Sequence, residues 1–254
     1  ESEMDYSAVF GNRATSYLGA CEHFPAIREQ EIARFVDLLC LKPGETFLDI
    51  PCGNGLVSER IAPTVRYLGL DPAATFVDHC RNRNKPVVQA SMRCTGLPSG
   101  SVDVIGSLTG IHHEADRLTL YAEWFRLLRP GGRLVIADVA CGGEVDRFLN
   151  EFVNEWNSEG HDGNFLCEQD VQLVKQSGFA NVLFSQLNHD WQAPTEIEMY
   201  DFMLALFGLD KQPSLAATQE AWRHLGWSKD REVCRLPWSL SVISAQKPEV
   251  ATFE

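Results

Sequence analysis

An apolar stretch at residues 47–55, FLDIPCGNG, carries one acidic residue and ends in a glycine-containing loop. The acid is Asp49, and the glycines are Gly53 and Gly55. Glycines directly after a strand let the backbone approach a ligand closely, and the free N–H groups of a following helix point at that ligand. The next apolar run, RYLGLD, ends in Asp71, where a carboxylate can accept hydrogen bonds from ribose hydroxyls. The two runs therefore predict a site for a nucleoside-containing cofactor.

The glycine spacing alone does not identify the cofactor. The dinucleotide fingerprint has a third glycine three residues after the second, and this chain has Ser58 at that place. An aspartate inside the preceding strand, Asp49, is also unusual for that fingerprint. A nicotinamide-dependent oxidoreductase is therefore a less favoured alternative.

Apolar runs and amphipathic segments alternate along the chain up to residue 139, and this alternation predicts parallel βαβ units in a doubly wound sheet. Further helices and two more strands are expected after that point. The expected strands are 46–50, 66–71, 87–90, 101–108, 133–139, 181–189 and 238–247. The expected helices are 28–41, 56–62, 72–83, 115–128, 144–159 and 168–177.

The sequence also suggests how the chain divides. Residues 1–43 are expected to form an N-terminal helical cap, and residues 44–193 the cofactor-binding α/β core. Residues 194–233 have helical spacing and are too apolar for a mobile loop, so we expect a helical insertion that serves as a lid or as an oligomer contact. Residues 234–254 supply the last strand and the tail. A homodimer is a hypothesis that follows from the insertion.

From Leu48 onward the chain resembles the class I S-adenosylmethionine-dependent methyltransferases, in particular the small-molecule, methyltransferase type 11-like members. Their first motif is similar to L-D-x-G-C-G-x-G, with Pro51 here in place of a glycine. YLGLDP, LPSGSVDVI, GIHHEAD, FRLLRPGGRLVIADV and SGFANVLF follow in the order of the family over residues 44–190. The resemblance implies a Rossmann-like, seven-stranded, mostly parallel sheet whose last strand is antiparallel.

The same resemblance implies S-adenosyl-L-methionine as cofactor and S-adenosyl-L-homocysteine as product. It places Asp49 near the methionine amino group and Asp71 on the ribose hydroxyls. No acid follows the third strand to bind the adenine amine, so Met92 is expected to pack on the adenine face instead. The full set of expected cofactor residues is Asp49, Pro51, Gly53, Gly55, Asp71, Pro72, Ala90, Ser91, Met92, Ser107 and Leu108.

Methyl transfer from a sulfonium is an in-line displacement, in which the cofactor carries the chemistry and the protein supplies alignment. A base is needed only where the acceptor must lose a proton. His113 and His112 follow the fourth expected strand, at the edge where open α/β sheets bind ligands, so either is a candidate base. The alternative is a structural pair, with one ring capping the next helix.

Four residues outside the motifs are candidates for binding the acceptor. Arg13 and Tyr17 lie in the N-terminal segment, and Trp156 and His161 follow the fifth expected strand. Packing at the rim or a solvated loop is the alternative for each. The apolar segments beside the core favour a small-molecule acceptor in an enclosed pocket. A protein that binds the cofactor for other chemistry, or to regulate a partner, is the alternative function.

The composition limits the partners and the location. A net charge of −13 disfavours DNA or RNA, which need a basic surface. No apolar run is long enough to span a membrane, and the first residues lack the apolar core of a signal peptide, so a cytoplasmic location is expected. The eight cysteines include no C-x-x-C pair, and no metal site is expected. Cys40, Cys80 and Cys234 are expected to be buried, reduced thiols.

Overall fold

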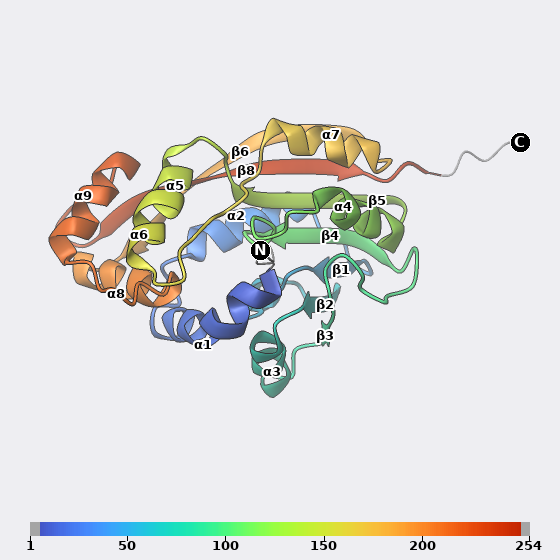
Figure 1. The fold of residues 1–254 in the computed structure, drawn as a ribbon. Coiled ribbons are helices and arrows are strands. Elements are labelled where there is room, and N and C mark those ends of the chain that lie inside the picture. The colour runs from blue at the N-terminus through green and yellow to red at the C-terminus, as the bar shows by residue number, and fades with distance from the viewer. Residues whose placement is uncertain (1–5, 250–254) are drawn as a thin grey trace, which may run out of the picture.

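One mixed sheet forms the centre of the structure, a computed structural model that describes residues 6–249 (Figure 1). Its strands run in the order β3-β2-β1-β4-β5-β8-β6, with the short β7 paired to β8. The strands β1 to β5 are parallel, and β8 is antiparallel to both of its neighbours, β5 and β6. The bounds are β1 Thr46–Asp49, β2 Arg66–Asp71, β3 Val87–Gln89, β4 Val102–Leu108, β5 Leu128–Val139, β6 Ala180–Ala193, β7 Ser228–Lys229 and β8 Cys234–Gln246. The predicted Rossmann-like sheet with an antiparallel last strand is confirmed, and β7 is an addition to it.

The helices also follow the prediction, with one clear exception after the glycine loop. They are α1 Tyr6–His23, α2 Glu29–Leu39, α3 Ala74–Asn82, α4 Arg117–Leu127, α5 Glu144–Arg147, α6 Asn154–Trp156, α7 Glu168–Gln176, α8 Glu196–Leu206 and α9 Leu215–Leu225. A π-helical segment, η2 Phe148–Val153, joins α5 to α6. The helix predicted for residues 56–62 was wrong, because only a five-residue 3₁₀ helix, η1 Leu56–Arg60, forms there. Pro63 explains the difference, since a proline disfavours α conformation in the residue before it.

Strand β5 shows why the sheet is buried on both faces. Leu134 and Ile136 belong to one hydrophobic cluster, together with Trp124 of α4. Val135 lies in a second cluster, together with Phe35 of α2. Because successive side chains of a strand point to opposite faces, α2 and α4 must cover opposite sides of the sheet. The near-continuous apolar sequence of the strand reflects this double burial.

The remaining helices gather at one end of the sheet. Figure 1 shows α1, α5, α6, α8 and α9 at the end toward which β4 and β5 point. Helix α1 packs against α8, and the Ser16 hydroxyl donates a hydrogen bond to the Ala205 carbonyl. The expected cap and the expected insertion therefore meet above the carboxyl ends of the parallel strands. Residues 1–5 of that cap and 250–254 of the tail lie outside the described residues.

The cysteines differ in part from the expectation. Cys80 and Cys234 are buried free thiols, whereas the expected burial of Cys40 was wrong. Cys40 is exposed and ends α2 in a left-handed conformation. A disulfide joins Cys141 and Cys167, which the sequence did not predict.

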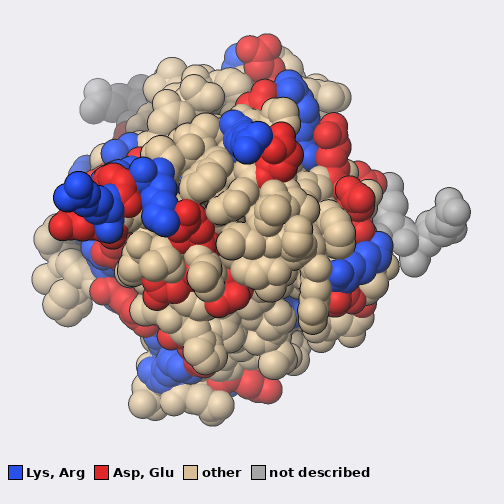
Figure 2. Space-filling view, turned by 90° about the vertical axis from the view of Figure 1, so that its left-hand side faces the viewer, with Lys and Arg blue, Asp and Glu red and all other residues tan. Residues whose placement is uncertain are grey.

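Two properties of the surface and of the helices bear on possible partners. Figure 2 shows Lys and Arg interspersed with Asp and Glu on the face in view, without a broad basic patch. Among residues 6–249, no helix combines the length and the apolar character that crossing a bilayer requires.

Candidate functional site

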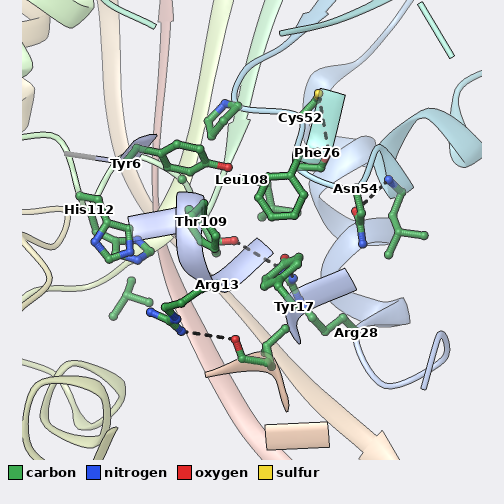
Figure 3. A pocket seen from close by; sticks show the side chains of 18 of the residues that line it. Tyr6, Arg13, Tyr17, Arg28, Cys52, Asn54, Phe76, Leu108, Thr109 and His112 are labelled. Carbon is green, nitrogen blue, oxygen red and sulfur yellow. Dashed lines mark hydrogen bonds between the residues drawn. The ribbon is translucent and has the colours of Figure 1, made fainter. Parts of the chain in front are cut away.

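A cavity lies at the carboxyl ends of β1 and β4, where open α/β sheets bind ligands (Figure 3). Its volume is about 970 Å³ when the solvent in its open mouth is counted. Figure 3 shows Cys52 and Asn54 on one side of this space and His112 on the other. The cavity therefore has a glycine-loop end and a histidine end.

The glycine-loop end is formed by residues directly after β1. Asp49, Pro51 and Gly53 line the cavity, as does Leu108 at the end of β4. Pro51 packs closely on Gly110, where an added Cβ would lie 2.2 Å from the proline Cγ. The proline that replaces the family's glycine is thus accommodated by a glycine on the neighbouring strand's loop, which the sequence analysis did not single out.

Asp49 carries a buried carboxylate at this end. The Tyr67 hydroxyl donates a hydrogen bond to its Oδ2 over 2.7 Å. Burial raises the pKa of Asp49 to about 7, although the Tyr67 hydrogen bond acts in the opposite direction. An ammonium group bound nearby would stabilise the ionised form, which suits the expected place of Asp49 beside the methionine amino group.

We therefore expect S-adenosylmethionine binding to strengthen as the pH rises through 7. Free Asp49 holds a proton below its pKa, and that proton must leave when the ammonium group binds, so the affinity should fall about tenfold from pH 8 to pH 6. Calorimetric titration across this range measures the effect. The Asp49→Asn variant should bind more weakly and show a flatter pH dependence. An unchanged slope in that variant would assign the proton to another group.

Asp71 does not line the cavity, and its carboxylate already accepts three hydrogen bonds. Oδ2 accepts from the Gly53 N–H over 2.8 Å and from the Tyr6 hydroxyl over 3.0 Å, and Oδ1 accepts from the Ala73 N–H. Burial raises the pKa of Asp71 to about 6, against the effect of the two backbone donors. Tyr6 thus occupies the position that the sequence analysis gives to a ribose hydroxyl.

Six further residues of the expected cofactor set also lie outside the cavity lining. They are Gly55, Pro72, Ala90, Ser91, Met92 and Ser107. Met92 is buried under α4, and its carbonyl accepts a hydrogen bond from the Trp124 indole. The rings of Phe10 and Phe76 meet at 5.3 Å between centroids and line the cavity on this side. These six assignments stay predictions.

The histidine end brings together two neighbours in sequence and one distant residue. His112, His113 and His161 all line the cavity, and the His112 Nδ1 lies 2.8 Å from Asp138 Oδ1. Burial acts to raise the pKa of Asp138, but His112 and further hydrogen bonds outweigh it and lower that pKa. Burial lowers the pKa of His113 well below its usual range and that of His161 to about 3, so both rings are neutral near pH 7.

Of the predicted acceptor residues, Arg13 and Tyr17 line the cavity and Trp156 does not. The Arg13 guanidinium donates to the Leu206 carbonyl through Nη2, and its Nε has no hydrogen-bond partner among residues 6–249. Tyr17 accepts a hydrogen bond from Arg28. Trp156 packs at the edge of the core beside Phe152.

Several lining residues were not among the candidates that the sequence analysis named. Arg28 and Thr109 carry no motif that marks them, yet the Arg28 Nη2 donates to Thr109 Oγ1 at the cavity wall. Trp191 and Trp238 stack at 3.9 Å between ring centroids and also line the cavity. Their separation in the sequence does not indicate that the two indoles meet, because only the pairing of β6 with β8 brings them together.

Residues 48–136 match a family model described as a methyltransferase domain. This segment contains the glycine loop, Asp71, both neighbouring histidines and most of β5. The α/β core is a class I S-adenosylmethionine-dependent methyltransferase domain. S-adenosylmethionine is the cofactor of this domain class, and the cavity fits its methionine end, because Asp49 offers a carboxylate and Gly53 offers bare backbone there.

Known proteins similar to the methyltransferase domain act on different acceptors. A wheat (Triticum aestivum) phosphoethanolamine N-methyltransferase is 31% identical over 70% of this chain and 34% of its own length. A mouse (Mus musculus) tRNA (carboxymethyluridine(34)-5-O)-methyltransferase, ALKBH8, is 34% identical over 68% of this chain and 28% of its own length. This chain thus spans about a third of the length of such relatives.

Solved structures show the same fold. The phosphoethanolamine N-methyltransferase 2 of Haemonchus contortus, in complex with S-adenosyl-L-methionine, superposes with a TM-score of 0.68 and 16% identity. The match covers 96% of this chain and 60% of that one.

Proposed function

We propose that this protein transfers the methyl group of S-adenosylmethionine to a small-molecule acceptor by in-line displacement. The observation that carries the proposal is the single cavity that joins the glycine loop to the histidine end. The methionine end of the cofactor would lie against Asp49 and Gly53, with its methyl group directed toward the histidines. Alignment of this kind contributes about 7–11 kcal/mol to a displacement reaction.

The cap favours a small acceptor over a nucleic acid. Residues of helix α1 and the aromatic residues Phe207, Trp191 and Trp238 line the same cavity. A net charge of −13 also opposes binding to a polyanion. The likeness to a tRNA methyltransferase does not decide the acceptor, because similar domains serve different acceptors. We therefore propose residues 194–233 as a lid over the acceptor. A homodimer through this segment stays a hypothesis, which sedimentation of the protein in solution would test.

The proposal also names the residue that removes a proton from the methyl acceptor. Between the two histidines that the sequence nominates, His112 has the better geometry, because Asp138 orients its ring. The low pKa of His113 makes that ring a weak base. We therefore propose His112 as the general base.

Binding of the nucleoside half requires a local rearrangement. Tyr6 must release Asp71 before ribose hydroxyls can bind that carboxylate. We infer that the first turn of α1 moves when the cofactor enters and then closes over it.

Calorimetry combined with product analysis tests the function. S-adenosylmethionine and S-adenosylhomocysteine should bind with micromolar affinity and NADH should not. A screen of hydroxyl- and amine-bearing metabolites, phosphoethanolamine among them, should then yield S-adenosylhomocysteine. NADH binding alone would overturn the assignment. Cofactor binding without product from any acceptor would favour the alternative, a protein that uses the cofactor for other chemistry or for regulation.

A further inference from the structure

The three histidines of the cavity lie close enough to share one ligand. Each of His112, His113 and His161 offers a ring nitrogen within 4.8 Å of the nitrogens of the other two. The rings of His112 and His113 are 4.2 Å apart between centroids, and that of His161 lies 5.9 Å from His112 and 5.5 Å from His113. All three line the cavity rather than the interior of a core cluster.

Two of these rings are held by partners that fix the position of the ring proton. Asp138 Oδ1 accepts from Nδ1 of His112, which leaves Nε2 of that ring with a free lone pair. Asn150 donates from Nδ2 to the Asp146 carboxylate and to the Gly163 carbonyl, so its Oδ1 must face His161. That oxygen lies 3.1 Å from Nδ1 of His161 and also accepts from the Gly163 N–H. His161 therefore carries its proton on Nδ1 and likewise presents the lone pair of Nε2.

This arrangement is typical of metal-binding histidines. Such residues almost always donate the second ring N–H to a carboxylate or another acceptor, which orients the ring and raises its basicity. The charged groups that face the cluster are Asp138, which favours a bound cation, and Arg13, which opposes one. Asp138 is the closer influence on His112, because it is directly hydrogen-bonded to the ring.

We propose that His112, His113 and His161 bind one divalent transition-metal ion of the zinc type at the acceptor end of the cavity. Three imidazoles select zinc, cobalt or nickel over magnesium or calcium, which prefer oxygen ligands. Three protein ligands also leave one tetrahedral position open, as in catalytic rather than structural zinc sites. In such a site the open position would take a hydroxyl oxygen of the acceptor.

This inference rests on the proposed function and narrows its substrate class to hydroxyl-bearing small molecules. A bound cation lowers the pKa of the coordinated hydroxyl, whose proton leaves to water. An oxygen lone pair then forms the new bond to the methyl carbon, and the electrons of the breaking C–S bond stay on sulfur as the neutral thioether. With the ion bound, Nε2 of His112 is a ligand, so the cation takes over the task that His112 has in the metal-free protein.

Cobalt(II) binding to the metal-free chain of 254 residues provides a test that does not depend on activity. We expect one Co²⁺ per chain with visible absorption typical of nitrogen and oxygen ligands. His161→Ala should lower the affinity at least about tenfold, since even loss of an outer-shell partner costs 10–100-fold. His113→Phe should do the same while keeping a ring against Phe10. His224→Ala removes an exposed histidine and should change nothing.

The outcomes separate this proposal from the proposed function. Cobalt binding that is equally strong in the wild type, His161→Ala and His113→Phe would overturn the site, as would charge-transfer bands of thiolate ligands alone. Absence of Co²⁺ binding by the folded wild type would overturn it as well. S-adenosylmethionine binding, measured in the same samples, should persist in His161→Ala. If the wild type does not bind S-adenosylmethionine at all, the result counts against the proposed function and not against the metal site.

Discussion

Replacing Asp71 by asparagine is expected to lower the affinity for S-adenosylmethionine at least about tenfold. The carboxylate should accept hydrogen bonds from two ribose hydroxyls, and a hydrogen bond to a charged group contributes about 1.5–3 kcal/mol. Two such bonds amount to about 3–6 kcal/mol, and each 1.4 kcal/mol corresponds to a factor of ten. Asparagine keeps the size of the side chain but has only one acceptor oxygen. Calorimetric titration of both proteins measures the difference.

Tyr6→Phe is the matched control for this prediction. It removes the hydroxyl that donates to Asp71 and keeps the ring that lines the cavity. The affinity for S-adenosylmethionine should be unchanged or higher in this variant, because the ribose no longer competes with the tyrosine. Equal losses in Asp71→Asn and Tyr6→Phe would mean that Asp71 serves to anchor α1 rather than to bind the ribose.

The sheet was predictable because its strands carry their own signal. Strand β5 is buried on both faces, and its apolar run is bounded by glycines at one end and by a change of periodicity at the other. The short 3₁₀ helix after the glycine loop was not predicted correctly, although Pro63 is present in the sequence. Helical spacing in residues 56–62 competed with the effect of that proline, and the proline decided the length of the element.

The site was predictable only where it follows a strand end. Asp49 is the last residue of β1, His112 lies four residues after the end of β4, and both line the cavity. The meeting of His112 with His161 depends on a long connection that folds back, where the Asn164 N–H donates to the His112 carbonyl over 2.7 Å. The closure of the nucleoside half by Tyr6 depends on the docking of α1. Neither contact can be predicted from the spacing of residues in the sequence, because both join segments that are far apart in the chain.

Glu31→Ala is expected to destabilise the protein by about 3–5 kcal/mol, the usual cost of removing one partner of a buried ion pair. Glu31 is fully buried and pairs with Arg28 through Oε1. Its Oε2 accepts from the ring of His189 and from the indole of Trp191, each over 3.0 Å. The substitution would leave the Arg28 guanidinium without its carboxylate at the wall of the cavity. Denaturation by urea measures the free energy of unfolding.

The pH dependence of stability gives an independent check on the same group. Burial alone would raise the pKa of Glu31, but Arg28 and His189 outweigh it and lower that pKa to about 2. A carboxyl with a lowered pKa stabilises the fold above its unfolded pKa near 4.5, and that stability is lost as the pH falls toward 2. Glu31→Ala should therefore lose part of the acid sensitivity of the wild type in this window.

A second ion pair with the same spacing is the control, because Glu220 and Arg223 are also three residues apart on a helix but are exposed. Glu220→Ala should change the free energy of unfolding by less than about 0.5 kcal/mol, since exposed pairs contribute little. If both substitutions lower the free energy of unfolding by the same small amount, the hydrogen bonds of Glu31 to Arg28, His189 and Trp191 do not stabilise the fold. A large loss for Glu31→Ala alone would mean that the position of Arg28, and with it the contact to Thr109 at the cavity wall, depends on a carboxylate outside the cavity lining.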